Sequence, residues 1–210
     1  MRNLLSTKDQ RQLRLMETLI QNRNWMKLHE LADNLGCTER ILKNDLNELR
    51  AAFPNIDIQS SVNGIMIDLE VNTSVEDVYQ YFLAHSQSFQ LLEYLFFNEG
   101  LPIYRTIENL HSSNANLYRL GRNITKILSS QFQIELSFTP SEIRGNEIDI
   151  RYFFAQYFSE RYYFLDWPFP DLPEEDLTEF ADFFYKITNY PMRLDRKSTR
   201  LNSSHITRSR

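Results

Sequence analysis

The sequence predicts a mainly α-helical protein with small β-hairpin wings: two tandem winged helix-turn-helix units, followed by the start of an all-helical domain. Three observations predict this class. Helical hydrophobic periodicity changes to strand alternation around an Asn-Gly pair, the whole pattern returns 75 residues later, and aromatic-rich helical sequence begins at residue 146. The predicted units are residues 7–70, 71–145 and 146–194, with 195–210 as a separate tail.

The first unit has the pattern of three helices and a hairpin. A capping pattern, Thr7-x-x-Gln10, precedes the first helix, and Thr38 is placed to cap the third after a Gly-Cys turn. Alternating apolar residues on both sides of Asn63-Gly64 indicate a β-hairpin. The third helix carries an apolar stripe at i, i+4, i+7 and i+11, which predicts that this face is buried: Leu42, Leu46, Leu49 and Phe53.

The second unit repeats this order. Ser113 falls at the position of Thr38, and Leu117, Ile124 and Leu128 continue the stripe, although Gly121 stands where Leu46 is expected. Residues 134–144 supply a shorter wing. An additional helix over 75–85, with the capping pattern Thr73-x-x-Glu76, lies between the two units.

After residue 146 two aromatic-rich helices are expected, the second beginning near Asp171 and Pro173. The last stretch, DRKSTRLNSSHITRSR, has no apolar periodicity. Its segment from Asp195 to His205 resembles the translation of a common sequencing-adapter oligonucleotide. We therefore expect residues 195–210 to be a non-native, disordered and dispensable tail, and the natural chain to continue beyond Leu194.

Composition narrows the function classes. A single cysteine, Cys37, excludes an intramolecular disulfide framework and a cysteine-rich zinc site, as suits a reducing compartment. No apolar run reaches the roughly 18 residues that span a bilayer. The chain has no glycine-rich phosphate loop, nucleophile elbow or His-x-x-x-His pair. We expect a cytoplasmic protein without a membrane partner, and neither an enzyme nor a cofactor or metal binder.

Charge is unevenly distributed along a chain of formal net charge −5. Residues 1–50 carry nine Lys and Arg against seven Asp and Glu, whereas residues 166–182 contain seven acidic residues and no basic one. A locally basic segment in an acidic protein is compatible with a nucleic-acid partner.

The third helix of the first unit carries the candidate DNA contacts. With its apolar stripe facing inward, Arg, Lys and Asn residues face outward, and in a helix-turn-helix this face enters the DNA major groove. Arg can bind guanine edges, Asn adenine edges, and Lys phosphates. Glu39, Asp45 and Glu48 are also assigned to this surface, so a solvated face of mixed charge is the alternative. The candidates, including one in the wing, are Thr38, Arg40, Lys43, Asn44, Asn47, Arg50 and Asn63.

The corresponding helix of the second unit has similar outward residues. Two copies, each on the helix that a helix-turn-helix presents to DNA, favour DNA binding over a solvated face. We expect Arg40 and the central Asn44 and Asn47 to reach base edges, with Lys43 and Arg50 on either side, nearer the phosphates. The candidates in the second unit are Asn114, Asn116, Tyr118, Arg119, Arg122, Asn123 and Lys126.

Two successive helix-turn-helix units and the junction IRGNEIDIRYFFAQYFSERY (143–162) resemble the Mga/AtxA-type transcriptional regulators, over Thr7 to Leu194. The resemblance implies direct binding of double-stranded DNA, and activation of virulence or carbohydrate-linked genes. It also implies a phosphotransferase-system regulation domain from residue 146, self-association through the C-terminal region, and sugar phosphotransferase-system proteins as partners of the full-length parent. A winged-helix scaffold that binds proteins rather than DNA remains the alternative function.

Overall fold

The computed structural model describes residues 1–69, 74–162 and 167–188, and the expectations for the 195–210 tail lie outside these residues. The chain divides into two compact units, Met1–Tyr157 and Phe158–Arg210.

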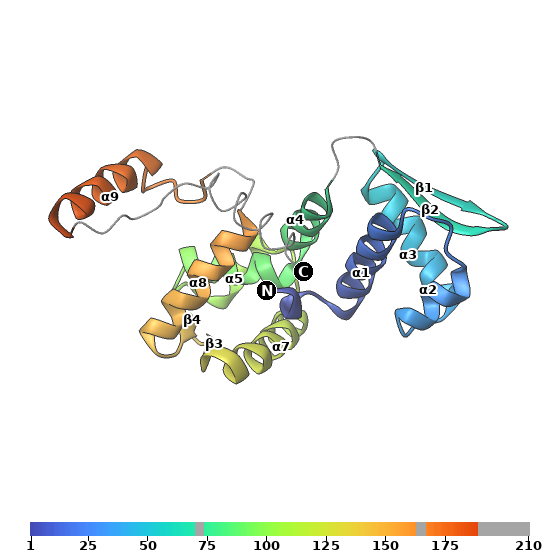
Figure 1. Cartoon of the computed structure of the whole chain (residues 1–210). Helices are drawn as coiled ribbons and strands as arrows, with labels where there is room; N and C mark the ends of the chain where they lie inside the picture. The colour runs from blue at the N-terminus through green and yellow to red at the C-terminus, as the bar shows by residue number, and fades with distance from the viewer. Residues whose placement is uncertain (70–73, 163–166, 189–210) are drawn as a thin grey trace. The chain divides into compact units, whose positions relative to one another are not determined.

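The first half of the larger unit is a winged helix-turn-helix (Figure 1). A short 3-10 helix, η1 (Arg2–Leu4), leads into three helices and a two-stranded antiparallel hairpin: α1 (Thr7–Asn22), α2 (Leu28–Asn34), α3 (Glu39–Ala52), β1 (Ile56–Ser61) and β2 (Gly64–Leu69). Met26 adds an isolated bridge to Ile65, which widens the wing. Gly64 permits this approach, because a Cβ there would lie 2.0 Å from the carbonyl oxygen of Met26.

The core of this half forms where the helical stripes meet. The inward leucines and methionine of α1 and the leucines of α3 are at most 1% exposed, and burial of each such side chain contributes roughly 1.5–3 kcal/mol. The isoleucines on the inner face of the hairpin complete the core. The buried residues are Leu13, Leu15, Met16, Leu19, Leu42, Leu46, Leu49, Ile56, Ile58, Ile65 and Ile67.

The second half of the larger unit repeats this order. An inserted helix, α4 (Val75–His85), contacts α1, and three further helices and a second antiparallel hairpin follow: α5 (Gln87–Phe97), α6 (Ile103–Asn109), α7 (Asn114–Phe132), β3 (Glu135–Phe138) and β4 (Ser141–Arg144). The predicted fold class, mainly helical with two tandem winged helix-turn-helix units, is confirmed.

The structure confirms some of the predicted helix caps and contradicts others. Thr38 and Ser113 cap α3 and α7 as predicted, each hydroxyl accepting a hydrogen bond from the third backbone N–H beyond it. The predicted caps of α1 and α4 are wrong by one residue. Ser6 caps α1 by accepting from the Asp9 amide at 3.1 Å, and Ser74 caps α4 in a reciprocal capping box with Asp77.

A shared reason explains both shifts. Each site has two adjacent hydroxyl residues in the sequence, Ser6-Thr7 and Thr73-Ser74, so the capping pattern fits either register. In both cases the register observed places an aspartate three residues after the cap. Its carboxylate there accepts a hydrogen bond from the capping serine and complements the positive end of the helix dipole.

Packing explains why Gly121 replaces the leucine of the first unit. A Cβ on Gly121 would lie 2.3 Å from Cε2 of Phe138, a buried residue of β3. The ring of Phe138 therefore fills the space that Leu46 fills in the first unit. Tyr118 packs edge-on against the same ring, with centroids 5.3 Å apart.

Helix α8 (Glu147–Arg161) begins near the predicted position but packs differently from the prediction. The hydroxyl of Tyr157 donates to the carbonyl oxygen of Phe89 at 2.8 Å, and Phe154 contacts Phe96 with ring centroids 4.6 Å apart. Because these aromatic side chains complete the core of the second winged unit, the compact unit extends to Tyr157, past the boundary drawn at residue 146.

The smaller unit begins at Phe158, whose ring lies 4.8 Å from that of Phe169. Trp167 Nε1 donates to the carbonyl oxygen of Leu172 at 2.5 Å, just before α9 (Glu174–Thr188). Three acidic residues occupy the first turn of α9, where they complement the helix dipole: Glu174, Glu175 and Asp176.

The contact between Gly121 and Phe138 predicts a stability effect opposite to helix propensity. Alanine is the better helix former by about 1 kcal/mol, but overpacking a core costs typically about 1–3 kcal/mol, so we expect Gly121→Ala to lower the free energy of unfolding. In a Phe138→Leu background the same substitution should cost less, because the shorter side chain leaves room. Urea unfolding of the four proteins measures this coupling, and equal costs in both backgrounds would contradict it.

Candidate nucleic-acid interface

A buried ion pair joins α3 to α1. Nε and Nη2 of Arg11 donate to the two carboxylate oxygens of Asp45 at 2.6 and 3.1 Å, and Nε2 of Gln12 donates to Asp45 Oδ1 at 3.0 Å. Asp45 is only 2% exposed, and its hydrogen bond with Arg11 raises the pKa of that guanidinium. The assignment of Asp45 to the outer surface is therefore wrong, because its carboxylate faces α1.

Glu48 is also turned away from the outward face. Its carboxylate forms an ion pair with Lys8 Nζ at 2.5 Å and accepts from Gln12 Nε2 at 2.8 Å. These two hydrogen bonds lower the pKa of Glu48. Two of the three carboxylates assigned to the face of mixed charge are thus paired with α1.

The outward face of α3 keeps four of the predicted candidates in solvent. A helix turns about 100° per residue, so these residues lie opposite or beside the buried leucines. The four exposed candidates are Arg40, Lys43, Asn44 and Asn47. Thr38 lies at the exposed N-terminal end of the same helix, where its hydroxyl already accepts from the Ile41 amide.

The sequence predicted that Lys43 and Arg50 lie on either side of this face, but in the structure they lie on the same side. They are seven residues apart, almost two helical turns, and both line a hollow of about 340 Å³ between α3 and the wing. Arg50 is half-buried there. Its guanidinium donates to the carbonyl oxygen of Ile58 at 2.9 Å, to Ser60 Oγ at 2.5 Å and to Asn47 Oδ1 at 3.3 Å.

Arg50 therefore fastens the wing to α3 and positions Asn47. Thr125 occupies the equivalent position in α7. Its hydroxyl accepts a hydrogen bond from the Leu136 amide at 3.0 Å, which joins α7 to the second wing. Tyr118, at the position of Lys43, is exposed on one side and packs on Phe138 of the second wing on the other.

The outward face of α7 is more basic than that of α3. Residues 114–132 include no Asp or Glu. Arg119 and Arg122 occupy the positions of Asn44 and Asn47, and Lys126 follows one turn later; all three are exposed. Asn114 is exposed at the N-terminal end of the helix. These side chains form a cationic surface on one side of α7.

Asn116 lies off the centre of this surface, whereas Asn123 shares a groove with Arg119 and Lys126. Asn116 is half-buried. Its side-chain Nδ2 donates to Ser112 Oγ at 2.9 Å, and its Oδ1 accepts from Arg119 Nη2 at 2.7 Å. Asn123 is exposed, and the groove that it lines with Arg119 and Lys126 is shared with the N-terminal segment. The seven candidates of the second unit are therefore divided between the outward centre of α7 and its flanks.

The tip of the first wing presents Asn63 to solvent, with its backbone amide donating to Ser61 Oγ at 3.0 Å. Beside it lies a cation that sequence reasoning missed. Lys27, exposed at the N-cap of α2, donates through Nζ to the carbonyl oxygen of Val62 at 3.2 Å. Its sequence position before the second helix gave no indication of the wing, because the contact joins residues 35 apart.

Within 1–69, 74–162 and 167–188, no three His, Cys, Asp or Glu residues are grouped so as to hold a metal ion. In the same ranges, no helix combines the length and apolar character needed to cross a bilayer. Burial raises the pKa of the Cys37 thiol, the reverse of the shift that activates a nucleophilic cysteine.

Comparison with known proteins assigns both winged units to one family. The family model of the M protein trans-acting positive regulator (MGA) HTH domain matches residues 6–65, and that of the Mga helix-turn-helix domain matches residues 71–158. A trans-acting regulator of Streptococcus pneumoniae serotype 4 is 47% identical over 194 residues, which are 92% of this chain and 39% of that protein.

The capsule synthesis positive regulator AcpA of Bacillus anthracis is 26% identical over 179 residues, 82% of this chain and 36% of AcpA. The chain thus spans less than two fifths of the length of either relative.

The buried ion pair predicts a large stability effect at a position that sequence alone placed in solvent. Removing one partner of a buried pair costs about 3–5 kcal/mol, and since Arg11 is partly solvated we expect Asp45→Ala to lower the free energy of unfolding by about 2–4 kcal/mol. Asp33→Ala, at an exposed position of α2, is the control and should change stability by less than about 0.5 kcal/mol. Chemical denaturation measures both, and equal stabilities for the two variants would show that Asp45 is not buried.

The two cations beside the wing should behave differently. Arg50→Ala removes hydrogen bonds between α3 and the wing, so it should lower the free energy of unfolding by roughly 1–2 kcal/mol. Lys43→Ala should leave stability within about 0.5 kcal/mol of the parent. Thermal and urea unfolding test this difference; a loss for Lys43→Ala as large as that for Arg50→Ala would contradict it.

Proposed function

The chain belongs, through its two helix-turn-helix domains, to the Mga family of transcriptional regulators, and we propose that it acts by sequence-dependent binding of double-stranded DNA. The observation that carries this proposal is the pairing of Asp45 and Glu48 with α1. Apart from the exposed Glu39 at the first position of α3, it leaves the outward face to arginine, lysine and asparagine side chains.

In this proposal the two winged units make different kinds of contact with DNA. In α3, Arg40, Asn44 and Asn47 contact base edges, since Arg and Asn can each form paired hydrogen bonds with a purine. In α7, Arg119 and Arg122 replace the two asparagines, and a helix without carboxylates attracts phosphates as well as guanine. The first unit then contributes most of the sequence discrimination, and the second contributes most of the salt-dependent affinity.

The remaining candidates contact the DNA backbone. Lys43, Lys27 and Asn63 lie beside the first wing, which in this arrangement reaches a phosphate or the minor groove. Thr38 and Asn114 lie at the N-terminal ends of their helices, where backbone N–H groups favour anions. Tyr118 and Asn116 contribute less, because Tyr118 packs on the second wing and the Asn116 side chain is bonded to Ser112.

We further propose that the longer protein is a positive regulator of virulence or carbohydrate-linked genes. The name of AcpA, a positive regulator of capsule synthesis, supports this role. Self-association through the C-terminal region, and control by sugar phosphotransferase-system proteins from a domain that begins within 146–194, are proposals for the longer protein on the same family basis.

Side-chain replacements test the proposed division of recognition. Arg40→Ala and Asn44→Ala should each cost about 1–3 kcal/mol on a preferred duplex and relax sequence choice. Lys43→Ala, Arg119→Ala and Arg122→Ala should weaken binding to preferred and scrambled duplexes alike, and reduce the slope of log affinity against log salt by about one. Fluorescence anisotropy across a salt series measures all five variants.

The control is Arg14→Ala, since Arg14 is exposed and carries the same charge on α1, which is not proposed to contact DNA. It should retain the affinity and the salt slope of the parent. If the chain binds no duplex even at low salt, the outward faces do not bind DNA, and a role as a protein-interaction scaffold is then the better account of the chain.

A further inference from the structure

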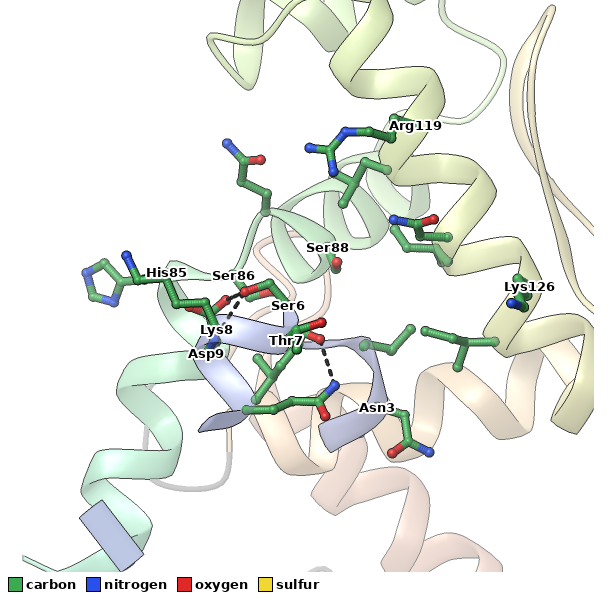
Figure 2. A pocket seen from close by; sticks show the side chains of 18 of the residues that line it. Asn3, Ser6, Thr7, Lys8, Asp9, His85, Ser86, Ser88, Arg119 and Lys126 are labelled. Carbon is green, nitrogen blue, oxygen red and sulfur yellow. Dashed lines mark hydrogen bonds between the residues drawn. The ribbon is translucent and has the colours of Figure 1, made fainter. Parts of the chain in front are cut away.

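A groove of about 1010 Å³, drawn in Figure 2, is lined by residues outside α3. Three segments that are distant in sequence line it: the N-terminal stretch with the start of α1, the junction of α4 and α5, and one side of α7. The proposed DNA contacts do not account for the first two of these segments.

Two serines at the start of α5 line this groove, and among the described residues their hydroxyls make no hydrogen bond that stabilises the fold. Ser86 is 4% exposed and Ser88 is 7% exposed. Ser86 is the N-cap of α5, yet its hydroxyl makes no capping hydrogen bond. Within the part of the chain that the structure describes, neither hydroxyl has a hydrogen-bond partner. Both residues line the groove, so each hydroxyl is available to donate a hydrogen bond to a ligand there.

Hydrogen-bond donors and positively charged side chains also lie at the start of α5 and along the groove. Backbone N–H groups in the first turn of α5 have no intrahelical acceptor, and they favour an anion. Figure 2 shows Arg119 reaching from α7 toward the start of α5, with Lys8 and Lys126 also lining the groove.

The acidic side chain on this surface is already engaged. The Asp9 carboxylate accepts from Ser6 Oγ at 2.7 Å, at the N-terminus of α1. His85, which also lines the groove, has its Nδ1 2.8 Å from the carbonyl oxygen of Tyr81. Lys8 is paired with Glu48, so Arg119 and Lys126 supply the positive charge that exceeds the negative charge of Asp9 along the groove.

We propose that this groove binds a phosphate group at the start of α5, through the hydroxyls of Ser86 and Ser88, the free backbone amides of the first turn and the guanidinium of Arg119. A phosphate accepts several hydrogen bonds at once, as this set of donors requires. The volume matches that of pockets that hold small molecules, so the ligand class is inorganic phosphate or a small phosphomonoester. A backbone phosphate of DNA is the second source of the same group.

The test is a titration of the 210-residue chain with inorganic phosphate at constant ionic strength, followed by ¹H–¹⁵N NMR. The amides of Gln87, Ser88 and Phe89 should shift in a saturable manner. Ser86→Ala and Ser88→Ala should each weaken binding about tenfold, the loss expected for one hydrogen bond to a charged group. Ser130→Ala is the matched control, because Ser130 also lines the groove and already donates to the carbonyl oxygen of Ile127.

A second titration uses a DNA duplex and separates the two sources. Serine-dependent shifts of these amides with phosphate assign the site to a free anion, and the same shifts with the duplex alone assign it to the DNA backbone. The proposal is overturned if neither titrant gives saturable shifts at Gln87–Phe89, or if the shifts persist unchanged when both serines are alanine. Neither result bears on whether α3 binds DNA.

Discussion

The hydrogen-bonded pair of Arg11 and Asp45 is the interaction on which the geometry of the first unit depends. It ties the middle of α3 to α1 across a core of leucines, and Gln12 extends the same network to Glu48. A rotation of α3 about its axis would leave a buried carboxylate without partners, which is costly. The pair therefore fixes which residues of α3 face solvent, and it withdraws negative charge from that face.

The second unit reaches the same architecture by different chemistry. Leu120 stands at the position of Asp45, so no ion pair orients α7 there. Instead, the ring of Phe138 occupies the space above Gly121, and Thr125 binds the wing where Arg50 does so in the first unit. Apolar packing and a single hydrogen bond thus replace a charged network. The outward face of α7 then carries arginines where α3 carries asparagines.

Local patterns predicted most of the fold, because helices, hairpins and the caps at Thr38 and Ser113 depend on neighbouring residues. The site was predicted less completely. Asp45 lies between Leu42 and Leu49 on the buried stripe, but its partner Arg11 is 34 residues away, so an acidic residue was assigned to solvent. The seven-residue spacing of Lys43 and Arg50 could have shown that they share a side. The contact of Tyr157 with Phe89 spans 68 residues, and no local signal indicates it.

The central claim is that α3 presents its asparagines to DNA while Asp45 and Glu48 stay paired with α1. Side-chain amide signals in ¹H–¹⁵N spectra test this directly, with a duplex that the protein selects from a random pool. The Asn44 and Asn47 side-chain amides should shift on binding, whereas the Gln12 side-chain amide, held by Asp45 and Glu48, should not. Shifts of Gln12 without shifts of Asn44 and Asn47 would show that DNA binds another surface.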